Sequence, residues 1–210
     1  MGAAVQVILF GLLMLGLFSI GDELNKEMNE VITLPLKALI VKGELGSGRN
    51  ADNATKLIEN VNRVWSVANI SFYVKSSAIV EMGSDEITTA LKGNGRIFAE
   101  AEGYDANAVN MFFIKNMSHN GISFPEYRTV VMPDKTTNLE YVAAAHELGH
   151  VLGLDHNPEE EYLMFAVCNG TAIALAEILD VRNNAKRLLV SFNSNTMVLP
   201  PASVEFSVIS

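Results

Sequence analysis

The sequence has a single cysteine, Cys168, in 210 residues. One cysteine cannot form a disulfide bond within the chain, so noncovalent contacts must stabilise the fold. A lone cysteine outside a metal or redox motif is typically a small buried residue, and we interpret Cys168 in this way.

Positive charge is also scarce, because 15 lysines and arginines stand against 24 aspartates and glutamates. A net charge of −9 argues against a nucleic-acid partner, since phosphate binding needs a basic surface. With 49% hydrophobic and 19% charged residues, the composition is that of a globular protein, and the length suits one domain. We therefore expect one folded, monomeric domain with an acidic surface.

Charged residues are absent from the first 21 positions, MGAAVQVILFGLLMLGLFSIG. The apolar run, residues 3–21, is long enough to span a bilayer as a helix. It also fits a secretory signal cut before Asp22, although the usual basic residues are missing, and a buried core helix is the least favoured alternative. We predict that residues 1–21 are a transmembrane anchor or a signal segment. Both place the rest of the chain outside the cytoplasm, membrane-anchored or secreted.

Strand and helix patterns alternate through the first half of the chain. Residues 32–43 favour a strand, residues 52–68 an amphipathic helix capped by Asp52 or Asn53, and residues 69–76 a second strand. This order is typical of a parallel pair with a right-handed crossover. Residues 78–106 give no clear pattern, and three short strands are predicted at 109–115, 121–124 and 128–132.

The second half of the chain is mainly helical. Thr137 and Glu140 fit a capping box at the start of a helix that Gly153 would end. Residues 171–192 favour another helix, interrupted or ended near Asn183 and Asn184. We predict that residues 22–192 form one folded domain, and that residues 193–210 form a separate C-terminal tail.

The stretch HELGHVLGLDH contains three of the four histidines. His146 and His150 lie four residues apart and share one helix face, and a left-handed turn at Gly153 can return His156 toward them. Three imidazoles leave the fourth position of a tetrahedral zinc ion open to water, as in catalytic zinc sites. We therefore predict that the three histidines bind one Zn²⁺.

Glu147 follows the first of these histidines directly. Zinc lowers the pKa of a bound water, and a neighbouring carboxylate can accept the proton as the oxygen attacks a carbonyl. The sequence therefore predicts a zinc-dependent endopeptidase with Glu147 as general base and a peptide or protein as substrate. The alternative is a membrane-tethered, zinc-stabilised binding module without turnover, which would use the histidines but not Glu147.

The pattern H-E-x-x-H-x-x-G-x-x-H resembles that of the metzincin zinc endopeptidases. The residues that follow, YLMFA, resemble the methionine turn of that clan, and HELGHVLGLDH with LMF is most similar to the matrixins, the matrix metalloproteinases. The resemblance implies that Met164 lies beneath the zinc. It also implies a metzincin-like α/β (α+β) fold with a twisted, mostly parallel sheet, an antiparallel edge strand, a zinc-site helix and a small C-terminal subdomain holding the methionine turn and one helix.

In a fold of this kind a short edge strand precedes the zinc helix, here at Gly121, Ile122 and Ser123, and we predict that substrate adds to it as an extended strand.

Two departures from related families stand out: Ala166 replaces a tyrosine used by astacins and serralysins, and Asn157 replaces the archaemetzincin cysteine. Calcium dependence stays open. A dinucleotide site at residues 46–51, GSGRNA, is disfavoured because no acidic residue ends the following strand.

Overall fold

A computed structural model describes residues 26–194 of the chain, which divides into two compact units, Met1–Val31 and Ile32–Ser210. In the first unit residues 26–29 are helical. The predicted anchor or signal segment, residues 1–21, and all but the first two residues of the predicted tail lie outside the described residues. Between residues 26 and 194, no helix is long and apolar enough to cross a membrane.

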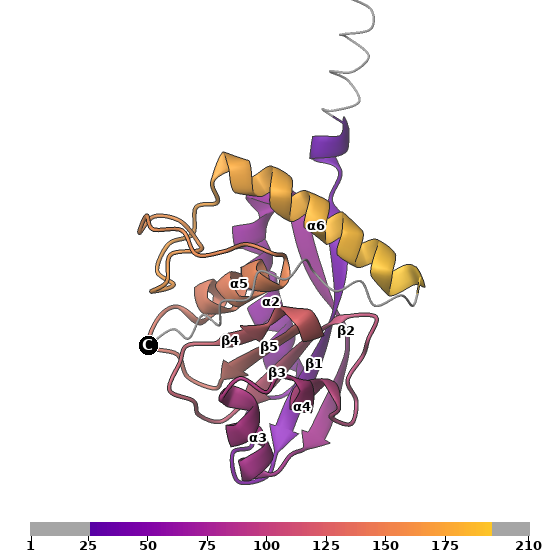
Figure 1. Cartoon of the computed structure of the whole chain (residues 1–210), viewed down its shortest axis with the longest axis vertical. Helices are drawn as coiled ribbons and strands as arrows, with labels where there is room; N and C mark the ends of the chain where they lie inside the picture. Colours follow the sequence, from indigo (N-terminus) through magenta and orange to yellow (C-terminus); the bar gives the residue numbers. More distant parts are fainter. Residues whose placement is uncertain (1–25, 195–210) are drawn as a thin grey trace, which may run out of the picture. The chain divides into compact units, whose positions relative to one another are not determined.

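The second unit is built on a five-stranded sheet in the order β2-β1-β3-β5-β4 (Figure 1). Four strands run parallel, and β4 pairs antiparallel with β5 at one edge. The strands are β1 (Ile32–Lys42), β2 (Ile70–Glu81), β3 (Val109–Ile114), β4 (Ile122–Phe124) and β5 (Thr129–Pro133). The prediction of a mostly parallel sheet with an antiparallel edge strand is thus confirmed.

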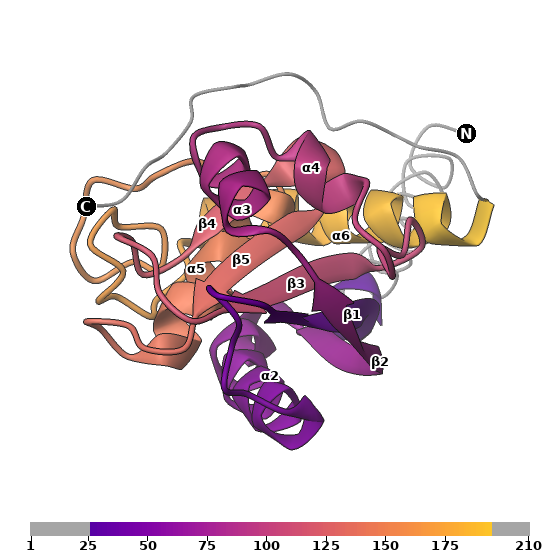
Figure 2. The same cartoon turned by 90° about the horizontal axis from the view of Figure 1, so that it is seen from below.

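Both faces of the sheet are covered, which explains why β1 is apolar along almost its whole length. Alternate residues such as Leu36 and Ala38 face a major core under α2 (Ala51–Trp65), α5 (Glu140–Val151) and α6 (Leu175–Ser194). Leu39 and Val41 face a minor core under α3 (Ser84–Leu91) and α4 (Arg96–Ala99). Figure 2 shows α2 on one side of the sheet and α3 and α4 on the other.

Helix α2 forms the crossover between β1 and β2. Its apolar stripe is buried in the major core, at Leu57, Ile58, Val61, Val64 and Trp65. The predicted cap at Asp52 or Asn53 is wrong, because the N-cap is Asn50. The Asn50 side chain accepts from the Asn53 amide, and the Asn53 side chain accepts from the Asn50 amide, so an Asn–Asn pair replaces the expected single cap.

Two further boundaries differ from the predictions because tertiary contacts outweigh local sequence. The predicted cap of α5 is wrong: the Thr137 amide and hydroxyl both donate to Asn120 Oδ1, and the helix begins at Glu140. The predicted break near Asn183 is also wrong, because α6 continues through it. Asn184 Nδ2 donates to the Leu152 carbonyl at 2.9 Å, so this asparagine anchors the helix and does not end it.

Arg49 ties the loop after β1 to the start of α5. Its guanidinium forms ion pairs with Asp134 and Glu140 and donates to the carbonyls of Pro133 and Asp134, while lying 5.1 Å from the centre of the Phe113 ring. These carboxylates and carbonyls leave the guanidinium turned toward protein and not toward a phosphate. The loop that resembled a dinucleotide fingerprint is therefore a structural clamp.

Arg49→Met should lower the free energy of unfolding by about 2 kcal/mol, because it removes charge-assisted hydrogen bonds and takes from Asp134 and Glu140 the cation that they share. The matched control is Arg96→Met, which breaks the exposed pair with Glu100 and should cost less than about 0.5 kcal/mol. Urea unfolding followed by circular dichroism measures both values. Equal effects of the two substitutions would show that the clamp adds nothing beyond a surface ion pair.

Cys168 is fully buried, as predicted from the sequence, and burial raises the pKa of its thiol to about 12. At pH 8 the folded chain should therefore react with a thiol reagent far more slowly than the unfolded chain, in which the thiol has its ordinary pKa. Spectrophotometric thiol titration with and without denaturant checks this. Rapid reaction of the folded chain would place the thiol at the surface.

Candidate active site

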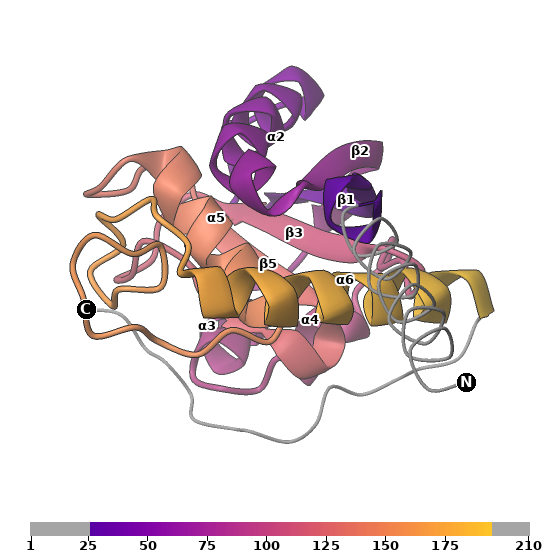
Figure 3. The ribbon, with the colours of Figure 1, turned by 90° about the horizontal axis from the view of Figure 1, so that it is seen from above.

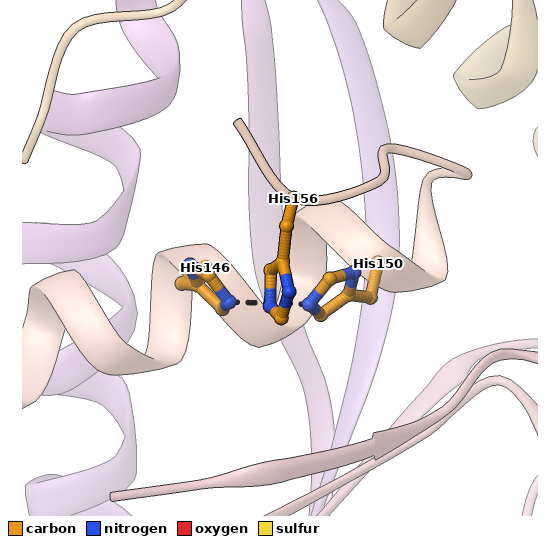
Figure 4. Close-up of side chains that lie close together, drawn as sticks. All are labelled: His146, His150 and His156. Carbon is orange, nitrogen blue, oxygen red and sulfur yellow. Dashed lines mark hydrogen bonds between the residues drawn. The ribbon is translucent and has the colours of Figure 1, made fainter. Parts of the chain in front are cut away.

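Three histidines converge beside α5 (Figure 4). His146 and His150 lie one turn apart on α5, and the chain then reverses at Gly153, whose φ is +83°. This backbone conformation favours glycine, and a Cβ there would also lie 2.7 Å from Asn184 Nδ2. The reversal brings His156 back, so that one nitrogen from each ring lies within 4.8 Å of the others.

Hydrogen bonds fix the tautomers of the first two histidines. His146 Nδ1 lies 2.8 Å from the Leu163 carbonyl, and His150 Nδ1 lies 2.8 Å from the Leu154 carbonyl. A carbonyl only accepts, so each Nδ1 carries the proton and donates it. In the neutral rings neither Nε2 atom then carries a proton, so each is in the form that coordinates a metal.

The two Nε2 atoms lie 3.1 Å apart. With no proton on either atom this contact is not a hydrogen bond, and two lone pairs at such a distance repel unless a cation lies between them. Nitrogens bound tetrahedrally to zinc at 2.0–2.1 Å stand about 3.3 Å apart. The donor set and its spacing therefore fit a zinc ion.

Burial keeps these rings neutral. It lowers the pKa of His146 to about 3 and that of His150 to about 4, and it also lowers the pKa of His156. The neighbouring His150 adds to the effect on His146, while the carbonyl of Leu163 opposes it. At neutral pH the histidines are thus in the form that binds metal.

Met164 lies directly against α5, in the turn that the sequence singled out. A Cβ at Gly149 would stand 2.5 Å from Met164 Sδ, so the close approach of turn and helix requires glycine at this position. The same turn supplies the Leu163 carbonyl that orients His146. The turn therefore packs against α5 and orients one of the three histidines.

Glu147 is 1% exposed, and its Oε2 has no hydrogen-bond partner among the described residues. Burial raises the pKa of its carboxyl group to about 7, and a hydrogen bond with Ser123 opposes this rise. An unpartnered buried carboxylate oxygen is costly unless a ligand or water completes it. Glu147 is therefore a buried carboxylate with one oxygen left for a ligand or a water molecule.

The edge of the sheet reaches this carboxylate. A Cβ on Gly121 would lie 2.7 Å from Glu147 Cγ, so glycine lets the chain pass close to the helix just before β4. Ser123 contacts Glu147, while the Ile122 side chain lies on the opposite face in the minor core. The Ile122 side chain therefore points away from Glu147.

Several residues that shape the site carry no signal in the sequence. Leu154 and Leu163 act through backbone carbonyls, which every residue type offers. Asn157 joins the site to Glu177 on α6, although the sequence marked it only as a departure from a related family. His119, by contrast, lies outside the histidine cluster and contacts the Ser118 hydroxyl at 3.1 Å.

A search of curated proteins found no match. Among solved structures, metalloproteinase-II from Bacteroides fragilis aligns with 73% of this chain and 53% of its own length, at 13% identity and a TM-score of 0.47. The chain thus spans about half the length of that protein.

The matrixin family profile matches residues 49–180. The match covers more than half of the chain, and it includes α5, the three convergent histidines and the methionine turn. The chain therefore belongs to the matrixin family.

Proposed function

We propose that this protein is a zinc-dependent endopeptidase in which Glu147 is the general base. Membership of the matrixin family supports a zinc metallopeptidase in general. The observation that carries the finer proposal is the combination of two unprotonated Nε2 atoms, 3.1 Å apart, with a buried carboxylate oxygen that no described residue satisfies. Both features support a metal site whose neighbouring carboxylate, Glu147, acts as proton acceptor.

His146, His150 and His156 would hold the metal through their ring nitrogens. Zinc, when bound, supplies a Lewis acid that polarises the substrate carbonyl and acidifies a water molecule. Glu147 Oε2 would accept a proton from the attacking water and pass it to the nitrogen of the leaving amine. The hydrogen bond from Ser123 would orient the carboxylate during both transfers, and the missing side chain of Gly121 lets the sheet edge approach it.

Glu147→Gln should lower kcat/KM by at least the ~10² to 10⁴ that a general base contributes, because the amide keeps the shape but cannot accept the proton. Zinc content should stay at one ion per chain. His156→Ala should lose both zinc affinity and activity, since it removes a proposed ligand. Cleavage of a peptide library and zinc analysis measure the two effects.

The binding-module alternative makes the opposite forecast for the parent chain. If the parent binds zinc but cleaves no peptide of a broad library, with or without added calcium, the chain is a zinc-stabilised binding module and the peptidase hypothesis is wrong. If Glu147→Gln cleaves as fast as the parent, Glu147 has no role as base and the mechanism is wrong.

We further propose that substrate binds along β4 as an additional antiparallel strand. The strand is short, lies at the edge of the sheet and passes next to Glu147 through Gly121. Along an edge strand successive amides point alternately toward the sheet and away from it, so either Ile122 or Ser123 offers its N–H to substrate.

Proline at the outward-facing position should raise KM by removing one donor while zinc content holds. Ile122→Pro and Ser123→Pro together cover both orientations, and peptide-cleavage kinetics of the two variants decide the matter. Unchanged kinetics in both would remove β4 from substrate binding.

For location we propose that the catalytic unit acts outside the cytoplasm, as an anchored or secreted protein, on the basis of the uncharged residues 1–21. A protease-sensitive tag after Ser210 should be accessible from outside intact cells or appear in the medium. Protection of the tag in intact cells, with release only on lysis, would contradict this location.

A further inference from the structure

The three histidines are not held alike. The rings of His146 and His150 each donate through Nδ1 to a backbone carbonyl. Within residues 26–194 the ring of His156 has no such hydrogen bond, and this histidine is exposed and lies in the loop after α5. Its position must therefore be set by what holds the neighbouring backbone.

The next residue, Asn157, is bonded at each of its polar groups except the carbonyl. Its amide donates to the Met164 carbonyl at 2.8 Å, and its Oδ1 accepts from the Glu159 amide at 3.1 Å. Its Nδ2 donates to Glu177 Oε1 at 2.9 Å. Glu177 uses its other oxygen, Oε2, to accept from the Ala174 amide at 3.0 Å, just before α6.

Helix α6, which carries Glu177, is itself held in place by hydrogen bonds to other parts of the chain. Arg182 Nη1 donates to the Ala68 carbonyl at 2.7 Å, and Asn184 Nδ2 donates to the Leu152 carbonyl at 2.9 Å. Figure 3 shows the loop from α5 leading into the first turn of α6, where Glu177 lies. Hydrogen bonds at Leu152 and Asn157 thus hold the loop that contains His156 against α6. Helix α6 is in turn bonded to Ala68, just before β2.

We propose that Asn157 and Glu177 are positioning residues for His156, and that their hydrogen bond sets how tightly the site holds its metal. The proposal rests on the proposed zinc function and goes further, because it assigns control of the third ligand to α6. Hydrogen-bonded residues behind metal ligands typically change metal affinity 10- to 100-fold when lost. Here the link reaches the ligand through the backbone of the adjacent residue.

The chemistry of the pair permits a reciprocal exchange. In Asn157→Asp two carboxylates face each other, and neither can donate. In Glu177→Gln a single carbonyl oxygen must serve both the Asn157 amide and the backbone amide of Ala174, so one bond is lost. In the double variant the new glutamine amide donates to the new aspartate while its oxygen still accepts from Ala174.

The experiment is a double-mutant cycle on the full chain with zinc as ligand. Zinc affinity is measured by competition with a chelator, ligand geometry by the visible spectrum of bound Co²⁺, and stability by thermal unfolding of the metal-free chain. Asn157→Asp should weaken zinc binding about 10- to 100-fold and alter the cobalt spectrum. Glu177→Gln should weaken it less, and the double variant should regain most of the affinity and the parent spectrum.

Glu160→Gln is the matched control, because it removes the same charge from an exposed side chain near the site and should leave zinc affinity unchanged. Parent-like affinity in Asn157→Asp, or no recovery in the double variant, would overturn the proposal while leaving the zinc function standing. So would affinity losses that merely follow losses in metal-free stability. A parent chain that binds no zinc would overturn the proposed function and this inference together.

Discussion

Two nitrogen lone pairs held 3.1 Å apart are the constraint on which the site depends. Left alone, His146 and His150 would protonate or turn away from each other. They do neither, because burial disfavours the imidazolium form and two backbone carbonyls fix the protons on the far side of each ring. Two unprotonated nitrogens at this distance are the arrangement that a bound metal cation requires.

The carbonyls that maintain this arrangement come from the chain after α5. Leu154 follows the reversal at Gly153, and Leu163 belongs to the methionine turn. The helix that carries the histidines cannot orient them without this loop, and the loop is held by Asn157 and α6. Metal binding and folding of the segment after α5 should consequently be coupled, since each supplies contacts that the other needs.

The sequence predicted the parts of the site whose chemistry resides in side-chain type and spacing. His146, His150 and Gly153 follow from helix geometry and turn preference, and the parallel pair β1–β2 follows from the order of strand, helix and strand. The rest of the sheet was implied only by the resemblance to the metzincins. Two predictions failed because a distant partner decides the outcome. Thr137 looks like a cap but bonds to Asn120, and Asn184 looks like a helix end but bonds to Leu152.

The same reasoning explains why the minor core and the Asn157–Glu177 link were not predicted. Helices α3 and α4 are short, and few of their residues are buried, so their sequence shows no strong period. The pairing of Asn157 with Glu177 joins residues 20 positions apart through a loop of irregular structure, which no periodicity describes. The three histidines can thus be recognised from the local sequence. Their placement around one site depends on contacts between α5, the loop after it and α6.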